Sequence, residues 1–570
     1  MWLRNIVFVL LVATGLVALA ANLFPKAAPP RVEDFQPSRF QDADFQSVVE
    51  KFNSAFRRQW AERNLHPAPR ASALTIIRRL SLGLTGTIPS LQEIRQFQAY
   101  GGPEPIQWWL AGILKDRRYA DYLAERLARA YVGTEDGPFI LYRRRRFVSW
   151  LSDQLMENRP YDEIVRHLIA DQGLWTDKPA TNFITVTIEN NKKPNPERLA
   201  GQVSRAFLAL RLDCAQCHDH PFEEWKQEQF QALAAFFGGV RQGFTGIYDS
   251  NGVYHMEDRR TKKKIVVEPN VPFLPELRPS HGTLREQLAH WVTHRENRYF
   301  ARAMANRMWA LMTGKPLIEP VDNIVADASS YPLLEQLDIL AEDFAAHHFD
   351  LHRLIQVIAA TEAFQRSSCA SNGFVDGEYA SVLALSPVAP GISSLPWGAM
   401  YLTAGELTPA HVQTWAVFPL TPLRPEQMVG GLLQSASLQT IDSESHILVR
   451  IATAAGQNEF IKRYGDAGKN ELEPQTGTLP QRLLLMNGKL VKEKTEQGIF
   501  NASSRIAMLA PDDKKAVETA YLAVLSRLPT AEESALFEKW LAGTKGKQRA
   551  RTLEDIYWVL INSMEFSLNH

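Results

Sequence analysis

Residues 528–541, LPTAEESALFEKWL, carry two signals that decide the fold class. Thr530 lies three residues before Glu533. This is the spacing of a capping box, in which each side chain binds a free backbone N–H at a helix start. The apolar residues between Leu536 and Leu541 then recur at the spacing of one helix face. The stretch therefore predicts an amphipathic α-helix.

Helical signals of the same kind recur through most of the chain. In PSLQEIRQF, Ser90 and Glu93 form a second capping-box pattern. Amphipathic spacing is also present in YADYLAERLARAYV, SWLSDQLMENRPYDEIVRHLI, ERLAGQVSRAFLAL, FARAMANRMWALM, LLEQLDILAEDFAAHHF and LEDIYWVLINSMEF. The sequence thus predicts a mainly α fold, with two helical domains and a short β-hairpin or irregular segment between them.

Composition shifts along the 570 residues suggest where the parts begin and end. We expect a signal peptide or N-terminal anchor at 1–21, a Pro-rich linker at 22–40, a CxxCH-containing helical domain at 41–240, a hairpin and linker at 241–280, and a C-terminal helical domain at 281–570. The hairpin is expected to turn around residues 250–252, Ser-Asn-Gly. An irregular insertion is expected at about 369–425, where Gly, Pro, Ser and Thr are dense.

The N-terminus indicates export. Arg4 precedes an apolar run from Ile6 to Ala21, and Ala18-Leu19-Ala20 has the small-x-small pattern of a cleavage site. A removed signal peptide is favoured, while the run is nearly long enough to remain as a membrane anchor. We therefore expect a periplasmic or otherwise exported protein, with anchoring to the inner membrane through residues 6–21 as the alternative.

Charge excludes one class of partner and suggests another. Lys+Arg and Asp+Glu are balanced at 63 each, so no global field draws the chain to nucleic acid, and we expect no nucleic-acid partner. Two local basic clusters, Arg143 to Arg146 and Arg259 to Lys264, are read as solvated surface or as contacts for an anionic glycan or an acidic protein face. No nucleotide-binding, HExxH or GxSxG motif is present, and no catalytic residue is assigned.

The stretch LDCAQCHDHPFEEW, residues 212–225, holds the most specific chemical signal. Cys214, Cys217 and His218 have the CxxCH spacing of covalent haem c attachment, in which two thiols bond the vinyl groups and the imidazole ligates iron as the proximal ligand. Attachment of this kind takes place outside the cytoplasm, in agreement with the leader. The first hypothesis is a monohaem c-type site.

Three other interpretations of the CxxCH motif stay open. A disulfide of the thioredoxin type suits an oxidising compartment, although that motif expects a βαβ setting. A Zn site would use Cys214, Cys217 and either His218 or His220, closed by Cys369. In the third, the two thiols are inert and buried.

Two further assignments depend on the haem hypothesis. His220 precedes Pro221, where we expect a helix to begin, so this histidine is either a hydrogen-bonding residue at the helix start or a cofactor-binding residue beside the haem. The candidates for a distal iron ligand are His255 or Met256 in the expected hairpin, and then His167, Met304 and Met308.

Several separated segments resemble one known family. Residues 200–237, which contain CAQCH, and residues 73–94, ALTIIRRLSLGLTGTIPSLQEI, are similar to a planctomycete-type, cytochrome-associated domain of unknown function. Residues 296–324, 340–368 and 559–570 resemble the companion C-terminal domain that follows it. The resemblance covers nearly the whole chain after the leader, with the segments in the family's order.

This resemblance implies an exported protein named for its c-type haem motif, with secreted sulfatase-like neighbours and no assigned reaction. Some members carry a further N-terminal cytochrome c domain, which this sequence lacks, so a single haem is expected. The favoured function is electron transfer with a redox partner protein. The alternatives are a periplasmic glycan- or protein-binding scaffold, in which CxxCH is a structural disulfide or Zn site, and a polysaccharide-active enzyme.

Overall fold

The computed structural model describes residues 35–134, 142–188, 193–219, 224–257, 263–324, 331–369, 407–442, 460–461, 463–465, 472, 478–496, 498 and 501–570. Helices dominate these residues, and the strands form only small antiparallel pairs. The mainly α prediction is confirmed. The expected leader at 1–21 and most of the linker lie outside the described residues.

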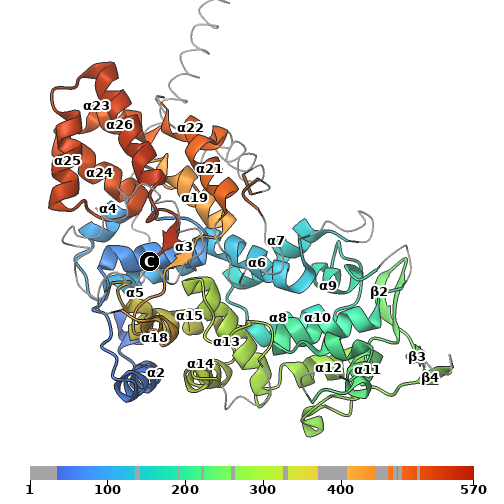
Figure 1. Ribbon diagram of the computed structural model, residues 1–570. Helices are drawn as coiled ribbons and strands as arrows, with labels where there is room; N and C mark the ends of the chain where they lie inside the picture. Colours follow the sequence, from blue (N-terminus) through green and yellow to red (C-terminus); the bar gives the residue numbers. More distant parts are fainter. Residues whose placement is uncertain are drawn as a thin grey trace, which may run out of the picture.

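The elements of the N-terminal half lead up to the CxxCH turn and the hairpins behind it (Figure 1). They are η1 Pro37–Phe40, α2 Ala43–Glu62, α3 Ala73–Thr85, α4 Leu91–Ala99, α5 Pro105–Leu114, α6 Arg117–Val132, α7 Arg144–Met156, α8 Tyr161–Ala170, η2 Pro179–Thr181, α9 Asn182–Thr185, α10 Pro196–Leu208, η3 Leu212–Gln216, α11 Gln227–Ala235, β1 Val240–Gly243, β2 Gly246–Asp249, β3 His255–Glu257 and β4 Lys264–Val266.

The C-terminal half is again helical. Its elements are η4 Pro275–Leu277, α12 Leu284–Val292, α13 Arg298–Thr313, α14 Leu334–Ala346, α15 Leu351–Ala360, α16 Glu362–Gln365, α18 Pro409–Gln413, β5 Thr421–Pro422, α19 Pro425–Ser435, α21 Leu479–Asn487, α22 Lys489–Thr495, α23 Ala502–Leu509, α24 Asp513–Leu525, α25 Ala531–Leu541, α26 Gly546–Ile561 and β6 Leu568–Asn569. Figure 1 shows α23 to α26 at one end of the molecule and β1 to β4 at the other.

Both predicted capping boxes are present. At α25, the Thr530 backbone N–H donates to Glu533 Oε2 (2.8 Å), and the Glu533 N–H donates to Thr530 Oγ1 (3.2 Å). At α4, Ser90 and Glu93 make the same reciprocal pair at 2.8 and 3.1 Å. These bonds satisfy backbone donors that a helix start otherwise leaves free.

Two local predictions were wrong. The expected turn at 250–252 is a connection between two hairpins, since β1 pairs with β2 and β3 pairs with β4. The first hairpin turns instead at Phe244 and Thr245. The helix expected to begin at Pro221 begins at Gln227, and the described residues 224–226 before it are not helical. Only part of the expected insertion is described, because residues 370–406 lie outside the described ranges.

One hydrophobic core joins both halves of the chain. It contains buried residues from Phe40 to Phe566. Helix α13 is central, because it packs against α3 and α10 of the N-terminal half and against α14 of the C-terminal half. Its fully buried Trp309 contacts Phe52 of α2, with ring centroids 5.5 Å apart, and Trp415, with centroids 5.0 Å apart.

The RRL segment of α3 has a structural role in this core. The guanidinium of fully buried Arg79 donates to the main-chain oxygens of His570 (2.7 Å), Phe364 (2.8 Å) and Arg366 (2.7 Å). It also lies 3.6 Å from the ring centroid of Phe418. Burial lowers the pKa of Arg79 to about 9, so the group keeps its charge at neutral pH. Arg79 thereby holds three chain segments to α3.

In the described part of the chain, no helix combines the length and the hydropathy needed to cross a membrane.

Candidate functional site

The CxxCH motif lies on a short 3-10 turn that follows α10 directly. Helix α10 begins at Pro196, capped by the Asn195 side chain, which accepts the Arg198 N–H (2.9 Å). It ends at Ala209, whose φ of 50° is in the left-handed region that non-glycine residues rarely adopt. The main-chain oxygen of Ala209 accepts the N–H of Ile324 (2.7 Å). This contact fixes the sharp exit that turns the chain into η3.

Within η3, one side is buried and the other faces solvent. Leu212 and Ala215 are 1% and 0% exposed, whereas Cys214 and Cys217 are exposed free thiols. Side chains three residues apart eclipse one another in a 3-10 helix. Because Cys217 directly follows the helix with αR backbone angles, the two thiols are presented on the same side. The chain therefore offers a pair of accessible sulfurs on an anchored turn.

Helix α11 holds the far end of this turn. The main-chain oxygen of Gln216 accepts the side-chain amides of Gln231 (2.9 Å) and Gln227 (3.2 Å). The backbone N–H of Gln227 donates to Asp219 Oδ1 (2.9 Å). Three hydrogen bonds thus fix the backbone on both sides of Cys217 and His218.

The near end of the turn is held by residues more than 100 positions away. Asp322 accepts two bonds from the Arg211 guanidinium, at 3.0 and 2.6 Å, and lies 3.6 Å from Arg205. Asn323 accepts the Arg211 backbone N–H (3.1 Å), and Arg205 pairs with Asp213 (2.6 Å). The sequence shows Asp322 and Asn323 as a polar cluster after a helix but does not link them to the CxxCH turn. Their role is seen only in the fold.

His218 is exposed and its ring is oriented by the backbone. Its Nδ1 lies 2.6 Å from the main-chain oxygen of Asp219. Since a carbonyl oxygen can only accept, Nδ1 carries the proton, and the lone pair of Nε2 is left for a metal. A ligating histidine usually has its other ring nitrogen bound in this way. The donor set of two exposed thiols and one oriented imidazole therefore fits a covalently attached haem.

The structure places the other sequence candidates in different surroundings. His220 lies outside the described residues. His255 and Met256 are on β3, and the Tyr254 hydroxyl just before them contacts Gln231 (2.5 Å) and Glu197 (2.7 Å). The β3 hairpin is thus tied to the same glutamine that binds the CxxCH turn.

The remaining candidates are on helices or in the core. His167 is on α8, where its Nδ1 contacts Asp171 (2.9 Å). Met304 and Met308 of α13 are fully buried in the core. Cys369 is 7% exposed and lies near Arg79, and burial raises the pKa of its thiol to about 12. Cys369 is therefore protonated in this fold.

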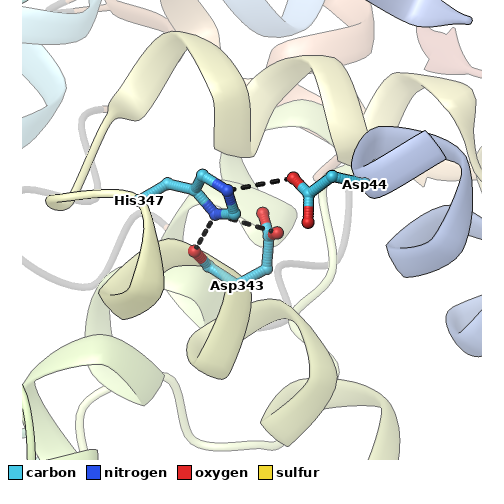
Figure 2. Close-up of side chains that lie close together, drawn as sticks. All are labelled: Asp44, Asp343 and His347. Atoms are coloured by element: carbon cyan, nitrogen blue, oxygen red, sulfur yellow. Dashed lines mark hydrogen bonds and ion pairs between the residues drawn. The ribbon is translucent and has the colours of Figure 1, made fainter. Parts of the chain in front are cut away.

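Among the described residues away from the CxxCH turn, one group of side chains that can ligate a metal converges. Figure 2 shows the imidazole of His347 between Asp44 of α2 and Asp343 of α14, with His347 Nε2 3.0 Å from Asp44 Oδ2 and Nδ1 3.1 Å from Asp343 Oδ1. Arg353 already pairs with both carboxylates, at 2.6 and 2.8 Å. Since a guanidinium neutralises the oxygens that a cation would need, this group joins α2 to α14 and α15.

The basic clusters have partly structural roles. Arg144 pairs with Glu125 at 2.9 Å, and the Arg143 guanidinium lies 5.3 Å from the Trp175 ring centroid. Arg145 and Arg146 are exposed. In the second cluster, Arg259, Arg260 and Lys262 lie outside the described residues.

The fold and the site define a mainly helical protein that presents a CxxCH turn to solvent. Residues 51–242 match the family described as protein of unknown function (DUF1549), with the short name PSCyt2, and residues 284–541 match the protein of unknown function (DUF1553), with the short name PSD1. The chain therefore contains these two domains of unknown function in this order. No curated protein and no solved structure matches it.

Proposed function

We propose that this chain is an exported monohaem c-type protein that exchanges electrons with a redox partner. The observation that carries the proposal is the bond from His218 Nδ1 to the Asp219 carbonyl, beside two exposed thiols on one turn. Cys214 and Cys217 would hold the haem and His218 would be the proximal ligand. A bound haem supplies one-electron exchange at its iron.

The residues around the turn support this role because they hold its backbone in place, and none of them is assigned a part in electron transfer. Gln231 and Gln227 fix the Gln216 carbonyl, and Asp322 fixes Arg211, so the backbone between these points is held from both sides. Because the turn is already fixed in this fold, its two thiols and its imidazole do not have to be ordered when haem is attached. Because the turn is exposed, a partner protein can approach it closely.

The test is production of the exported full-length chain in a host with haem-maturation machinery. We expect a pyridine haemochrome spectrum of c type and a peptide containing Cys214 and Cys217 that is heavier by one haem. Cys217→Ser should abolish the two-bond product. The matched control is Cys369→Ser, which removes the buried third cysteine and should leave the haem content unchanged.

Mass spectrometry of the native protein also separates the alternatives. Free thiols, a Cys214–Cys217 disulfide or bound zinc at this turn would each contradict the haem proposal. A disulfide or zinc would instead support the scaffold function.

A further inference from the structure

A separate cavity of about 300 Å³ lies far along the chain from the CxxCH turn. It is formed by α8, by the end of α12 with the loop that follows, and by the turn after α14. The charged and titratable residues that line it are Asp162, Arg166, His290, His294, Arg295 and His348. Two guanidinium groups and three imidazoles thus face one carboxylate.

That carboxylate is already neutralised. Asp162 Oδ2 pairs with Arg166 Nη2 at 2.8 Å, and Arg166 Nε also donates to Thr293 Oγ1 at 2.8 Å. Arg166 is therefore held in place at the cavity wall. Within the described ranges, Arg295 makes no ion pair, so its charge is available to a ligand. The cavity has an excess of positive charge at neutral pH.

The imidazoles add hydrogen-bond donors to this charge. His294 Nδ1 accepts the Glu296 backbone N–H (3.2 Å), so the neutral ring carries its proton on Nε2. Burial and the nearby Arg166 lower the pKa of His290, so that histidine is neutral at pH 7 and donates from only one ring nitrogen. Guanidinium and imidazole donors thus converge from α8, from the end of α12 and from the loop after α12.

The third imidazole is presented by a strained turn. His348 and Phe349 have φ values of 53° and 54°, in the left-handed region. The strain is held by the core, because Phe349 is 4% exposed and its oxygen accepts the Tyr161 N–H (3.1 Å). Residues kept in sparsely populated backbone conformations cluster at functional sites. The turn places an imidazole at the cavity with little backbone freedom.

We propose that this cavity binds a small organic molecule through an oxyanion group, either a phosphate or a sulfate monoester. Guanidinium and imidazole N–H groups are the donors that recognise such oxygens. The volume suits a ligand larger than a bare ion, since sites of about 300 Å³ and above accommodate small organic molecules. Ala345, Ala346 and Phe349 supply an apolar wall for the part that carries the anion.

Charged groups of both signs surround His290. They are Arg166 and Asp162 from α8 and Glu286 from α12. Glu296 and Glu342 line the adjoining hollow of about 490 Å³, which shares Arg295.

The test is calorimetric titration of the full-length chain with glucose 6-phosphate and glucose 6-sulfate at constant ionic strength. Inorganic phosphate, inorganic sulfate and glucuronate are titrated in parallel. We expect saturable 1:1 binding of at least one ester at pH 7, and weaker binding of the inorganic ions and the carboxylate. The ester that binds more tightly identifies the oxyanion.

Arg295, in the loop after α12, and Arg298, at the start of α13, provide variant and control. Arg295→Gln should weaken ester binding by roughly tenfold or more, because a charge-assisted bond is lost. Arg298→Gln removes the same charge from the adjoining hollow and should leave the affinity unchanged. Absence of saturable binding, equal affinity in the two variants, or equal affinity for the inorganic ions would each overturn the inference. The result does not depend on haem, since the cavity shares no residue with the CxxCH turn.

Discussion

At the scale of single residues, His352 on α15 is held in its neutral form. Its ring packs edge-on against Tyr119, with centroids 5.6 Å apart, and burial lowers its pKa to about 4 from the usual 6.5. Below pH 6.5 the unfolded chain binds a proton at this histidine that the folded chain does not. The free energy of unfolding therefore decreases as the pH decreases. From pH 6.5 to pH 5 this loss is about 2 kcal/mol, at about 1.4 kcal/mol per unit.

Urea denaturation at pH 7 and pH 5 measures this loss. Burial lowers the pKa of His570 to about 4 as well, so it contributes in the same direction. His352→Phe should therefore remove part of the pH-dependent loss, and the remainder is expected from His570, His290 and His411, whose pKa values burial also lowers. A wild-type pH dependence in the His352→Phe protein would show that this residue does not carry the effect.

The haem-site residues show which single residues can be found from sequence. Cys214, Cys217 and His218 are contiguous, and their spacing alone predicts a shared function, which stays a prediction. Asp322 and Gln231 orient the same turn. Asp322 is remote from it in the sequence, and Gln231 belongs to no recognisable motif. Their contribution depends on how helices pack, and one sequence contains no signal for that.

At the scale of elements, the two capping boxes have different surroundings. Both cap residues are buried, Thr530 at 7% and Ser90 at 1% exposed, but Ser90 Oγ also contacts Thr440 Oγ1 (2.9 Å). Thr530→Ala should lower the free energy of unfolding by about 1 kcal/mol, and Ser90→Ala by about 2 kcal/mol because the contact between Ser90 Oγ and Thr440 Oγ1 is lost in addition to the cap. Urea denaturation measures both, with Thr530→Ser as the matched control that keeps the cap. Equal losses at the two positions would contradict the assigned role of Thr440.

The start of a helix could be predicted from the sequence where a pair of nearby residues determines it. Capping boxes are local pairs, and both were correct. The start of α11 was not, because the Pro221 signal is local, whereas the helix begins where the Asp219 carboxylate accepts the Gln227 N–H and the Gln216 main-chain oxygen accepts the Gln227 side-chain amide. The hairpin turn was misplaced because Ser250-Asn251-Gly252 has turn composition but connects two hairpins.

At the scale of the whole molecule, the two matched segments share one interior. Helix α13, within residues 284–541, packs against α3 and α10, which lie within residues 51–242. Periodicity shows that each helix has an apolar face but not which helix covers it. The expected boundary at 241–280 stays a prediction, since a change in composition does not exclude a core that continues across it.

The shared core predicts cooperative unfolding. Trp309 lies between Phe52 and Trp415, so Trp309→Ala leaves a large cavity, and we expect a loss of about 3–5 kcal/mol. Calorimetry should show one transition in both the wild-type and the variant protein, shifted to lower temperature in the variant, and hydrogen exchange should increase in α3 and α10 as well as in α14. Trp540→Ala is the matched control, because this tryptophan is 43% exposed and should cost far less. Two separate transitions, or faster exchange confined to residues 284–541, would show that the N-terminal segment folds without α13.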